Sequence, residues 1–450
     1  MSTEPPTPVG TSGPVAPLGE LTRTLGGKAL PLSFSMLAGM AGNMVTAGVI
    51  GNVATADLAA YALVIAVFAP LLMVVQGALR GSMPFIAENE DDPAALAPVV
   101  RDSTWLALVL GGAGGVVLAL TPLWARVIGV AEPTLVALGT VPPMLVGLGM
   151  IAAAFKTSVT VLLIGLGRNR SVMVLSLVDA ALAITVTPVL VLGAGPVPGL
   201  GLTGAALAMA VNGSVMAALF LYVSRRRTVL RGQPVGPGTP GWAGVVRIAR
   251  VGLPTGSTLL IKFGTLSLLG LVVARIGTEQ AAAHQLLVVI ANLVFIPAVA
   301  VGQSSIPFTA RAAGKGSSVE VRRSVTAGYV VAVPVVAVAL ALLWVLAGTV
   351  VGMFTPDPSV REAVIGLLPV LSAVVIADAV QALPGMGLLG LKRARYSMYT
   401  FAVCYGLLCA AAVPAAAVGG LAGVWIAYAV ATAGLIVGQG VAFHRESARL

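Results

Sequence analysis

Twelve long apolar segments constrain this chain more than any other feature of its sequence. A bilayer core about 30 Å thick takes about 20 apolar residues per helix, and helices satisfy their own backbone hydrogen bonds in lipid. Only 9% of the 450 residues are charged, whereas soluble domains carry about 25%. We therefore expect an all-α membrane protein with twelve transmembrane helices, at about 30–53, 58–84, 104–127, 138–164, 171–193, 200–223, 251–275, 281–307, 325–353, 363–389, 396–416 and 419–442.

The distribution of lysine and arginine predicts which side of the membrane each loop faces. If the N-terminus is cytoplasmic, 20 of the 26 basic residues lie on the cytoplasmic side and three on the other. This asymmetry is typical of bacterial membrane proteins and explains the net charge of +10 without nucleic acid. We expect a plasma-membrane protein with both termini cytoplasmic. The last three cations, Arg80, Lys156 and Lys262, fall inside spans.

The sequence contains two copies of one unit. SMPFIA at 82–87 matches SIPFTA at 305–310, and GLGRNRSVM at 165–173 matches GLKRARYSM at 390–398. The second copy is offset by 223 residues in the first match and by 225 in the second. These offsets cover an even number of helices, so the copies have the same orientation. Such halves usually enclose a binding site near mid-membrane. We expect a disordered tail (1–24), a six-helix bundle (25–223), a cytoplasmic linker (224–250) ending in a short surface helix, a second bundle (251–443) and a C-terminal tail (444–450).

Two ionisable residues lie deep inside spans of the second half. Lys262, a positive charge, is near the middle of its segment. Asp378, a negative charge, lies inside another apolar segment, LSAVVIADAVQALPG. A charge at that depth costs about 2.5–3.5 kcal/mol on insertion scales, so such residues face the protein interior, have partners and mark functional sites. The alternative for Asp378 is a buried polar residue that fixes helix packing.

Four sequence stretches carry a resemblance to a known family. They are GLPTGSTLLIKFG, RIGTEQAAAHQ, SIPF…GKG and IADAVQALPGMGLLGLKRARY. Over about residues 25–445 the chain resembles multidrug and toxic compound extrusion (MATE) transporters of the multidrug/oligosaccharidyl-lipid/polysaccharide exporter superfamily. The resemblance implies two six-helix bundles related by a pseudo-two-fold axis and arranged as a V, which move substrates by alternating access.

The resemblance also assigns residues in the second half. Asp378 falls where coupled members of the family have a tenth-span aspartate, and Gln381 lies on the same helix face. Lys262 departs from the pattern, because related exporters often have a glutamate there. We predict an ion pair between Lys262 and Asp378 that proton gain and loss make and break, and hence proton rather than sodium coupling. The alternative is a static pair that locks the C-terminal half.

In the first half the candidates are an amide and a carboxylate. Asn43 occupies the place of a first-span aspartate; it would bind an ion or substrate but not carry a proton. Asp179 is the carboxylate available inside the fifth span, and its alternative is a structural pair with Lys156 or Arg80. Arg80 is expected to extend toward the cytoplasmic surface. The further cavity candidates are Lys156, Gln285 and Asn292.

We predict a secondary antiporter that exports amphipathic organic compounds or drugs in exchange for protons or sodium. A lipid-linked oligosaccharide flippase of the same superfamily is the alternative. Three cations against two carboxylates in the spans favour neutral or anionic substrates. The sequence has no catalytic acidic cluster and no nucleotide-binding lysine motif, so we expect neither an enzyme nor ATP use. We expect no cofactor, a monomer, and membrane lipids as the other partners.

Overall fold

The computed structural model describes residues 17–51, 55–194, 198–227 and 238–450, and the regular elements in these ranges are helices. In chain order the helices are α1 (Leu18–Ile50), α2 (Thr55–Arg80), α3 (Met83–Glu88), α4 (Pro93–Ala119), α5 (Thr121–Ile128), α6 (Glu132–Leu138), α7 (Val141–Gly165), α8 (Asn169–Leu192), α9 (Gly201–Arg227), α10 (Trp242–Ala274), α11 (Thr278–Gly314), α12 (Ser318–Val345), α13 (Ala347–Phe354), α14 (Pro358–Gly366), α15 (Leu368–Gly390) and α16 (Ala394–Ser447).

Within the described ranges, eleven helices are long and apolar enough to cross a membrane. The last one, α16, has 54 residues and contains Gly420, whose φ of 56° and ψ of −140° are not helical and favour glycine. The stretches on either side of Gly420 run antiparallel, because Gln439 Nε2 donates a hydrogen bond to Ser397 Oγ at 3.1 Å. The two arms of α16 therefore correspond to the last two expected spans, and the chain reverses between them at Gly420.

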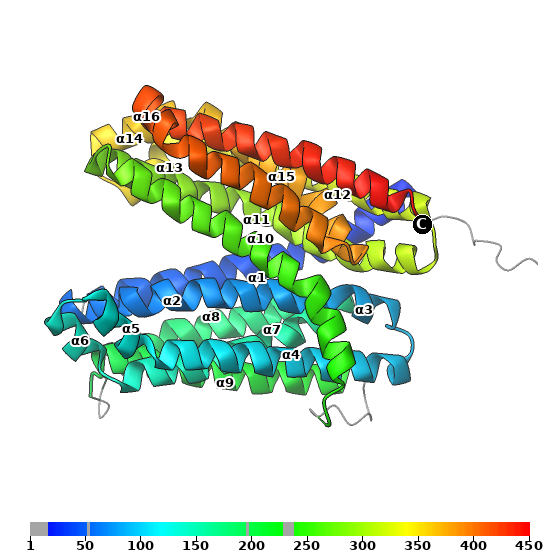
Figure 1. Cartoon of the computed structure of the whole chain (residues 1–450), viewed down its shortest axis with the longest axis horizontal. Coiled ribbons are helices and arrows are strands. Elements are labelled where there is room, and N and C mark those ends of the chain that lie inside the picture. The colour runs from blue at the N-terminus through cyan, green and yellow to red at the C-terminus, as the bar shows by residue number, and fades with distance from the viewer. Residues whose placement is uncertain (1–16, 52–54, 195–197, 228–237) are drawn as a thin grey trace, which may run out of the picture.

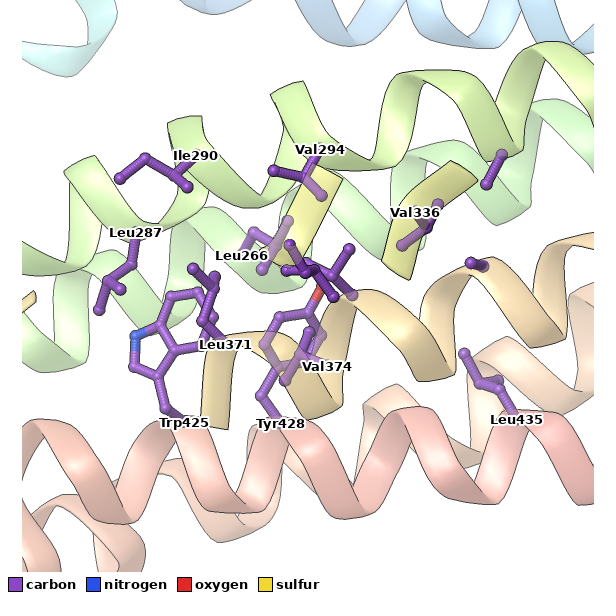
Figure 2. Close-up of a cluster of buried hydrophobic side chains, with 14 of the residues drawn as sticks. Leu266, Leu287, Ile290, Val294, Val336, Leu371, Val374, Trp425, Tyr428 and Leu435 are labelled. Carbon is purple, nitrogen blue, oxygen red and sulfur yellow. The ribbon is translucent and has the colours of Figure 1, made fainter. Parts of the chain in front are cut away.

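The helices form two layers, which confirms the expected all-α architecture of two bundles. In Figure 1, α2–α9 form one layer and α11–α16 the other, and α10 crosses from the first layer to the second. Each layer has its own apolar core. The core of the second layer includes Leu266, Val374, Trp425 and Tyr428, which pack together in Figure 2. The chain thus buries its apolar faces in two separate units that meet along α1, α2, α10 and α11.

Three predicted boundaries differ from the structure. Helix α1 begins at Leu18, so residues 18–24, which composition placed in a disordered tail, are its first turns; residues 1–16 lie outside the described ranges. Residues 242–250 are helical, but they are the continuous start of α10 and not a separate surface helix. Their Trp242 ring lies 6.3 Å from the Trp105 ring of α4. Residues 444–447, expected in the C-terminal tail, belong to α16.

The two layers are joined most closely at one end, which we call the basic end. It carries the turns that follow α2, α7, α11 and α15, including Arg168, Lys315 and Lys392. Figure 1 shows the layers farther apart at the opposite end, where α5, α6, α13 and α14 lie. The molecule is therefore V-shaped.

Candidate functional site

The predicted charge pair in the second half is present in the structure. Lys262 Nζ of α10 donates to Asp378 Oδ2 of α15 at 2.7 Å, and the two side chains are only 9% and 7% exposed. Small residues precede Lys262 on α10, and they allow α10 to pack closely on its neighbours. A pair this deep is held in place because removing either partner leaves an uncompensated charge, which costs about 3–5 kcal/mol.

Three side chains surround this pair. Gln381 Nε2, one turn along α15, donates to Asp378 Oδ1 at 3.2 Å. The hydroxyl of Tyr428 donates to Asp378 Oδ2 at 3.4 Å. The ring of Phe295 on α11 lies 4.6 Å from Lys262 Nζ, a cation–π distance. The carboxylate thus accepts bonds from three helices, so a change in its charge acts on α10, α15 and α16 together.

A cavity lies on each side of the pair. The larger one, of about 120 Å³, extends toward the basic end; Lys262 and Gln381 line it with Thr258 and Ser397. The smaller one, of about 10 Å³, lies toward the opposite end and is lined by Asp378, Asn292, Trp425 and Tyr428, among others. The pair therefore separates two spaces that lead toward different ends of the bundle.

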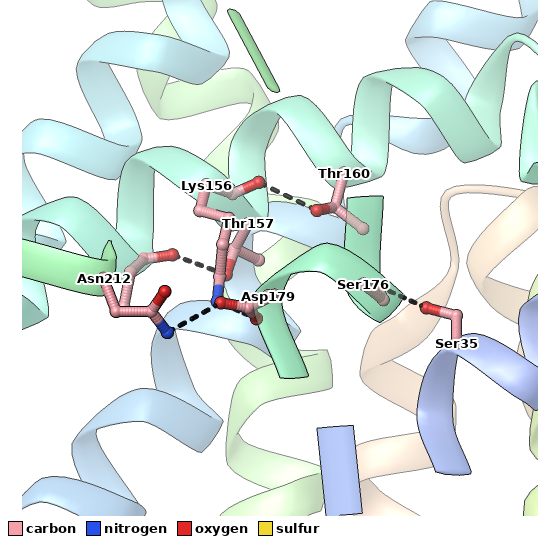
Figure 3. A network of polar contacts seen from close by, with 8 residues as sticks. Ser35, Lys156, Thr157, Thr160, Ser176, Asp179 and Asn212 are labelled. Atoms are coloured by element: carbon pink, nitrogen blue, oxygen red, sulfur yellow. Dashed lines mark hydrogen bonds and ion pairs between the residues drawn. The ribbon is translucent and has the colours of Figure 1, made fainter. Parts of the chain in front are cut away.

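The first half contains a second charge pair. Lys156 Nζ of α7 lies 2.9 Å from Asp179 Oδ2 of α8, and the side chains are 27% and 22% exposed. Asn212 of α9 donates to Asp179 Oδ1 at 3.0 Å. Figure 3 shows these three side chains converging, with the Ser35–Ser176 hydrogen bond nearby. Asp179 thus has the partner that the structural interpretation predicted.

The remaining candidates lie in different surroundings. Asn292 lines the smaller cavity and donates to the carbonyl of Val288 at 2.9 Å. Gln285 is exposed at the start of α11 and lines neither of these two cavities. Asn43 lies in α1, and its side chain is outside the described part of the molecule. Arg80, expected at the surface, lines the larger cavity instead.

Sequence reasoning did not predict two of the side-chain contacts that the aspartates make. Tyr428 and Asn212 each come from the helix that follows the helix of the aspartate that they contact. Asn212 had only the general signal of an amide inside an apolar span, and Tyr428 had none, since tyrosine is common in such spans. Within the described residues, no group of three or more His, Cys, Asp or Glu side chains is arranged to hold a metal ion.

The basic end is closed by backbone contact between the halves. Gly77 of α2 and Gly81, which follows α2, face Gly256 and Gly252 of α10 so closely that a Cβ on Gly77 would overlap the backbone of Gly256. Both pairs have the G-x-x-x-G spacing that lets membrane helices approach. A methyl group at this crossing would push the two helices apart.

Polar contacts extend this closure toward the basic surface. Glu88 pairs with Lys392 at 2.5 Å. Asn169 Nδ2 donates to Ser304 Oγ at 3.0 Å, and Arg311 pairs with Glu90 at 2.7 Å. Each contact joins one half to the other, so opening this end requires breaking all three.

Two bundles of repeated helices, with charge pairs and cavities buried inside them, define a polytopic membrane transporter. The family model MatE matches residues 31–189 and again 254–413, one match in each half and together well over half of the chain. This chain belongs to the MatE family of transporters.

Relatives and solved structures agree with this assignment. A probable multidrug resistance protein NorM of Aromatoleum aromaticum is 27% identical over 390 residues, which cover 83% of this chain and 80% of the relative. The multidrug resistance protein PmpM of Pseudomonas aeruginosa is 27% identical over 387 residues, or 82% and 78% of the two chains. A crystal structure of MATE in the straight conformation matches with a TM-score of 0.82 at 20% identity, over 95% of this chain and 96% of that one.

Proposed function

We propose that this protein exports amphipathic organic compounds from the cytoplasm in exchange for protons. The observation that carries the proposal is the buried Lys262–Asp378 pair, because its members are titratable and it separates the two cavities. The similarity to multidrug resistance proteins supports efflux of organic compounds. The basic end is the cytoplasmic one under the positive-inside rule.

The exchange works through competition for one carboxylate. When Asp378 takes up a proton, it loses the charge that attracts the Lys262 ammonium, and the lysine is then free to move into the larger cavity. When Asp378 loses the proton, the pair forms again and brings α10 back against α15. Since Tyr428 also donates to Asp378, the second stretch of α16 follows the same change.

The lysine argues against sodium as the coupling ion. Sodium prefers several oxygen ligands, and Asp378 already accepts bonds from an ammonium, an amide and a hydroxyl. A second carboxylate that would help to hold the ion is lacking among the described residues that line the two cavities. A proton needs only one basic oxygen.

Alternation of access also requires opening of the basic end. The glycine crossing of α2 and α10 and the Glu88–Lys392 and Glu90–Arg311 pairs hold it closed. These ion pairs are partly exposed and each contributes little alone, so the closure is reversible.

Transport into and out of proteoliposomes tests the coupling ion. Purified protein would be reconstituted with a panel of radiolabelled neutral, anionic and cationic aromatic compounds inside, and a proton or a sodium gradient would be imposed separately. We expect an inward proton gradient alone to accelerate efflux. Efflux driven by a sodium gradient at clamped pH, with no response to protons, would refute the proposal.

A further inference from the structure

Arg80, the last residue of α2, is a cation to which the exchange mechanism gives no role. None of the ion pairs in the described part of the chain includes it. Its partly buried side chain lines the larger cavity, whose other walls come from α10, α11, α15 and α16. The N-terminal half thus places a guanidinium in a cavity built by the C-terminal half.

The charge of this cavity is set by Arg80. Its lining residues include two cations, Arg80 and Lys262, and among them the structure describes no aspartate or glutamate. Lys262 is neutralised by Asp378 behind it, whereas an arginine stays protonated in proteins. The cavity therefore carries one net positive charge, and a charge removed from water without a partner is costly. An anionic group in the cavity would remove that cost.

A second donor in the same cavity also lacks a partner. The buried hydroxyl of Thr255 makes no hydrogen bond to any described group, although the residue lines the cavity. Thr255 and Arg80 both lie at the crossing of α2 and α10, where Gly77 and Gly81 contact α10. A guanidinium and a hydroxyl from residues that line one cavity are donors that suit the oxygens of a carboxylate, sulfonate or phosphate.

Most of the remaining wall is carbon, although Thr258, Gln381, Ser397 and Gln439 also line the cavity. Leu259, Val299, Met386, Leu389 and Phe401 line the cavity, which has a volume of about 120 Å³. An engineered cavity of about 150 Å³ takes a benzene molecule, so this space fits an anionic group with one ring or a short chain. Larger bodies would extend out of the cavity.

We propose that this cavity is a subsite for the anionic group of an amphipathic organic substrate, bound by Arg80 and Thr255 with its apolar part against the carbon wall. The inference rests on the proposed export function and names its substrate class. It predicts a preference for organic anions over neutral and cationic compounds of the same shape.

Binding of a matched set of probes tests the subsite. Benzenesulfonate, benzenesulfonamide and phenyltrimethylammonium share one ring and differ in charge, and the sulfonate stays ionised at every working pH. Isothermal titration of the full chain in neutral detergent should give at least about tenfold tighter binding of the sulfonate than of the sulfonamide, the size of one charge-assisted hydrogen bond. Equal affinities in the wild type would overturn the proposal, and this measurement needs no variant.

Variants identify the residue responsible. Arg80→Gln should lose the roughly tenfold preference for the sulfonate while binding the sulfonamide as before. Arg126→Gln is the matched control, because Arg126 is exposed on α5 and its loss should change nothing. A sulfonate preference that survives in Arg80→Gln would overturn the role of Arg80.

Two further measurements are needed. One distinguishes a lipid headgroup from an exported substrate as the source of the anion, and the other distinguishes failure of the subsite from failure of the proposed export function. If short-chain phosphatidylglycerol displaces the sulfonate and the sulfonate is never exported, the site is a lipid headgroup site and the substrate assignment is overturned. Export of the sulfonamide in response to a proton gradient reports on the proposed function alone. Failure of that export contradicts the antiport function, whereas failure of the sulfonate preference alone contradicts only the subsite.

Discussion

The two halves contain the same ingredients, one lysine–aspartate pair each, but in different arrangements. In the first half α7 supplies the lysine, and the aspartate is on the next helix, α8. In the second half α15, the repeat counterpart of α7, supplies the aspartate, and the lysine comes from α10. The offset of 225 that aligns GLGRNRSVM with GLKRARYSM places Lys156 opposite Gln381, one turn from Asp378.

The two pairs also differ in burial. Lys156 and Asp179 are about a quarter exposed, whereas Lys262 and Asp378 are less than a tenth exposed. A more exposed pair is solvated in either charge state and acts mainly as a clamp between neighbouring helices. A deeply buried pair changes its surroundings when it changes charge. The comparison therefore supports the proposal that coupling lies in the C-terminal half and that the N-terminal pair is structural.

The largest expected difference between the two halves is in proton-driven efflux after each aspartate is replaced. Asp378→Asn should reduce proton-driven efflux to the background of empty liposomes, because the amide cannot take up and release the proton. Asp179→Asn should retain proton-driven efflux, since its pair only joins α7 and α8. Efflux from proteoliposomes at equal protein density measures both. The reverse pattern would move coupling to the N-terminal half.

A double-mutant cycle on each pair tests whether the more deeply buried pair has the larger coupling energy. Lys262→Ala should destabilise the protein by about 3–5 kcal/mol, because it leaves Asp378 without its cation. Adding Asp378→Ala should restore much of that loss. The same cycle on Lys156 and Asp179 should give a smaller coupling energy. Denaturant unfolding in detergent measures all six variants, and equal coupling in the two halves would contradict the comparison.

The next expected effect concerns the contact between the halves. Gly77→Ala should destabilise the closed basic end by about 1–3 kcal/mol, because its Cβ would overlap the backbone of Gly256. Gly112→Ala in α4 is the control, since nothing lies within 4 Å of the added carbon. Disulfide formation between cysteines introduced at Glu88 and Lys392 measures closure. An unchanged rate in Gly77→Ala would show that the glycines do not set this contact.

The smallest expected effect is a pH-dependent difference between the starts of two short helices, α14 and α6, at the end opposite the basic end. Asp357 caps the start of α14 and accepts hydrogen bonds from the side chain and backbone of Ser359. These bonds lower the pKa of its carboxyl below the usual range. The stabilisation is therefore complete above the unfolded value of about 4 and disappears as the pH falls through the lower folded value. The equivalent start of α6, Ala131, has no side-chain cap.

Amide exchange at acid pH measures this difference. The amides of Ser359 and Val360 should exchange faster as the pH falls below about 4, after correction for the intrinsic rate, while those at the start of α6 show no such change. Asp357→Asn should abolish the pH dependence. A pH dependence that persists in this variant would exclude the aspartate as its cause.

The sequence was sufficient to predict the class of fold and the ion pair between Lys262 and Asp378. The apolar segments and the repeat predicted two helical bundles, and the rarity of charges left Lys262 and Asp378 as partners. The direction of the Arg80 side chain was predicted wrongly. An arginine that extends to the membrane surface and one that lines an internal cavity look the same in the sequence. What separates them is the close crossing of α2 and α10, a tertiary contact.

Other differences have equally local causes. The helical register of α11 turns His284 inward and Gln285 outward, and a polar residue near the end of a span does not reveal that choice. The start of α1 was missed because LGELTRT is polar although it is helical.

Helix α10 begins against α4 in one half and ends inside the other, with Pro254 between these parts. A proline removes one helical hydrogen bond and is a usual place for a bend. If the halves rock, this continuous rod either flexes at Pro254 or lifts its first two turns away from α4. Because Lys262 lies two turns beyond Pro254 on the same rod, flexing there would tilt the lysine relative to Asp378. In such a movement α10 would link the angle between the halves to the distance between Lys262 and Asp378.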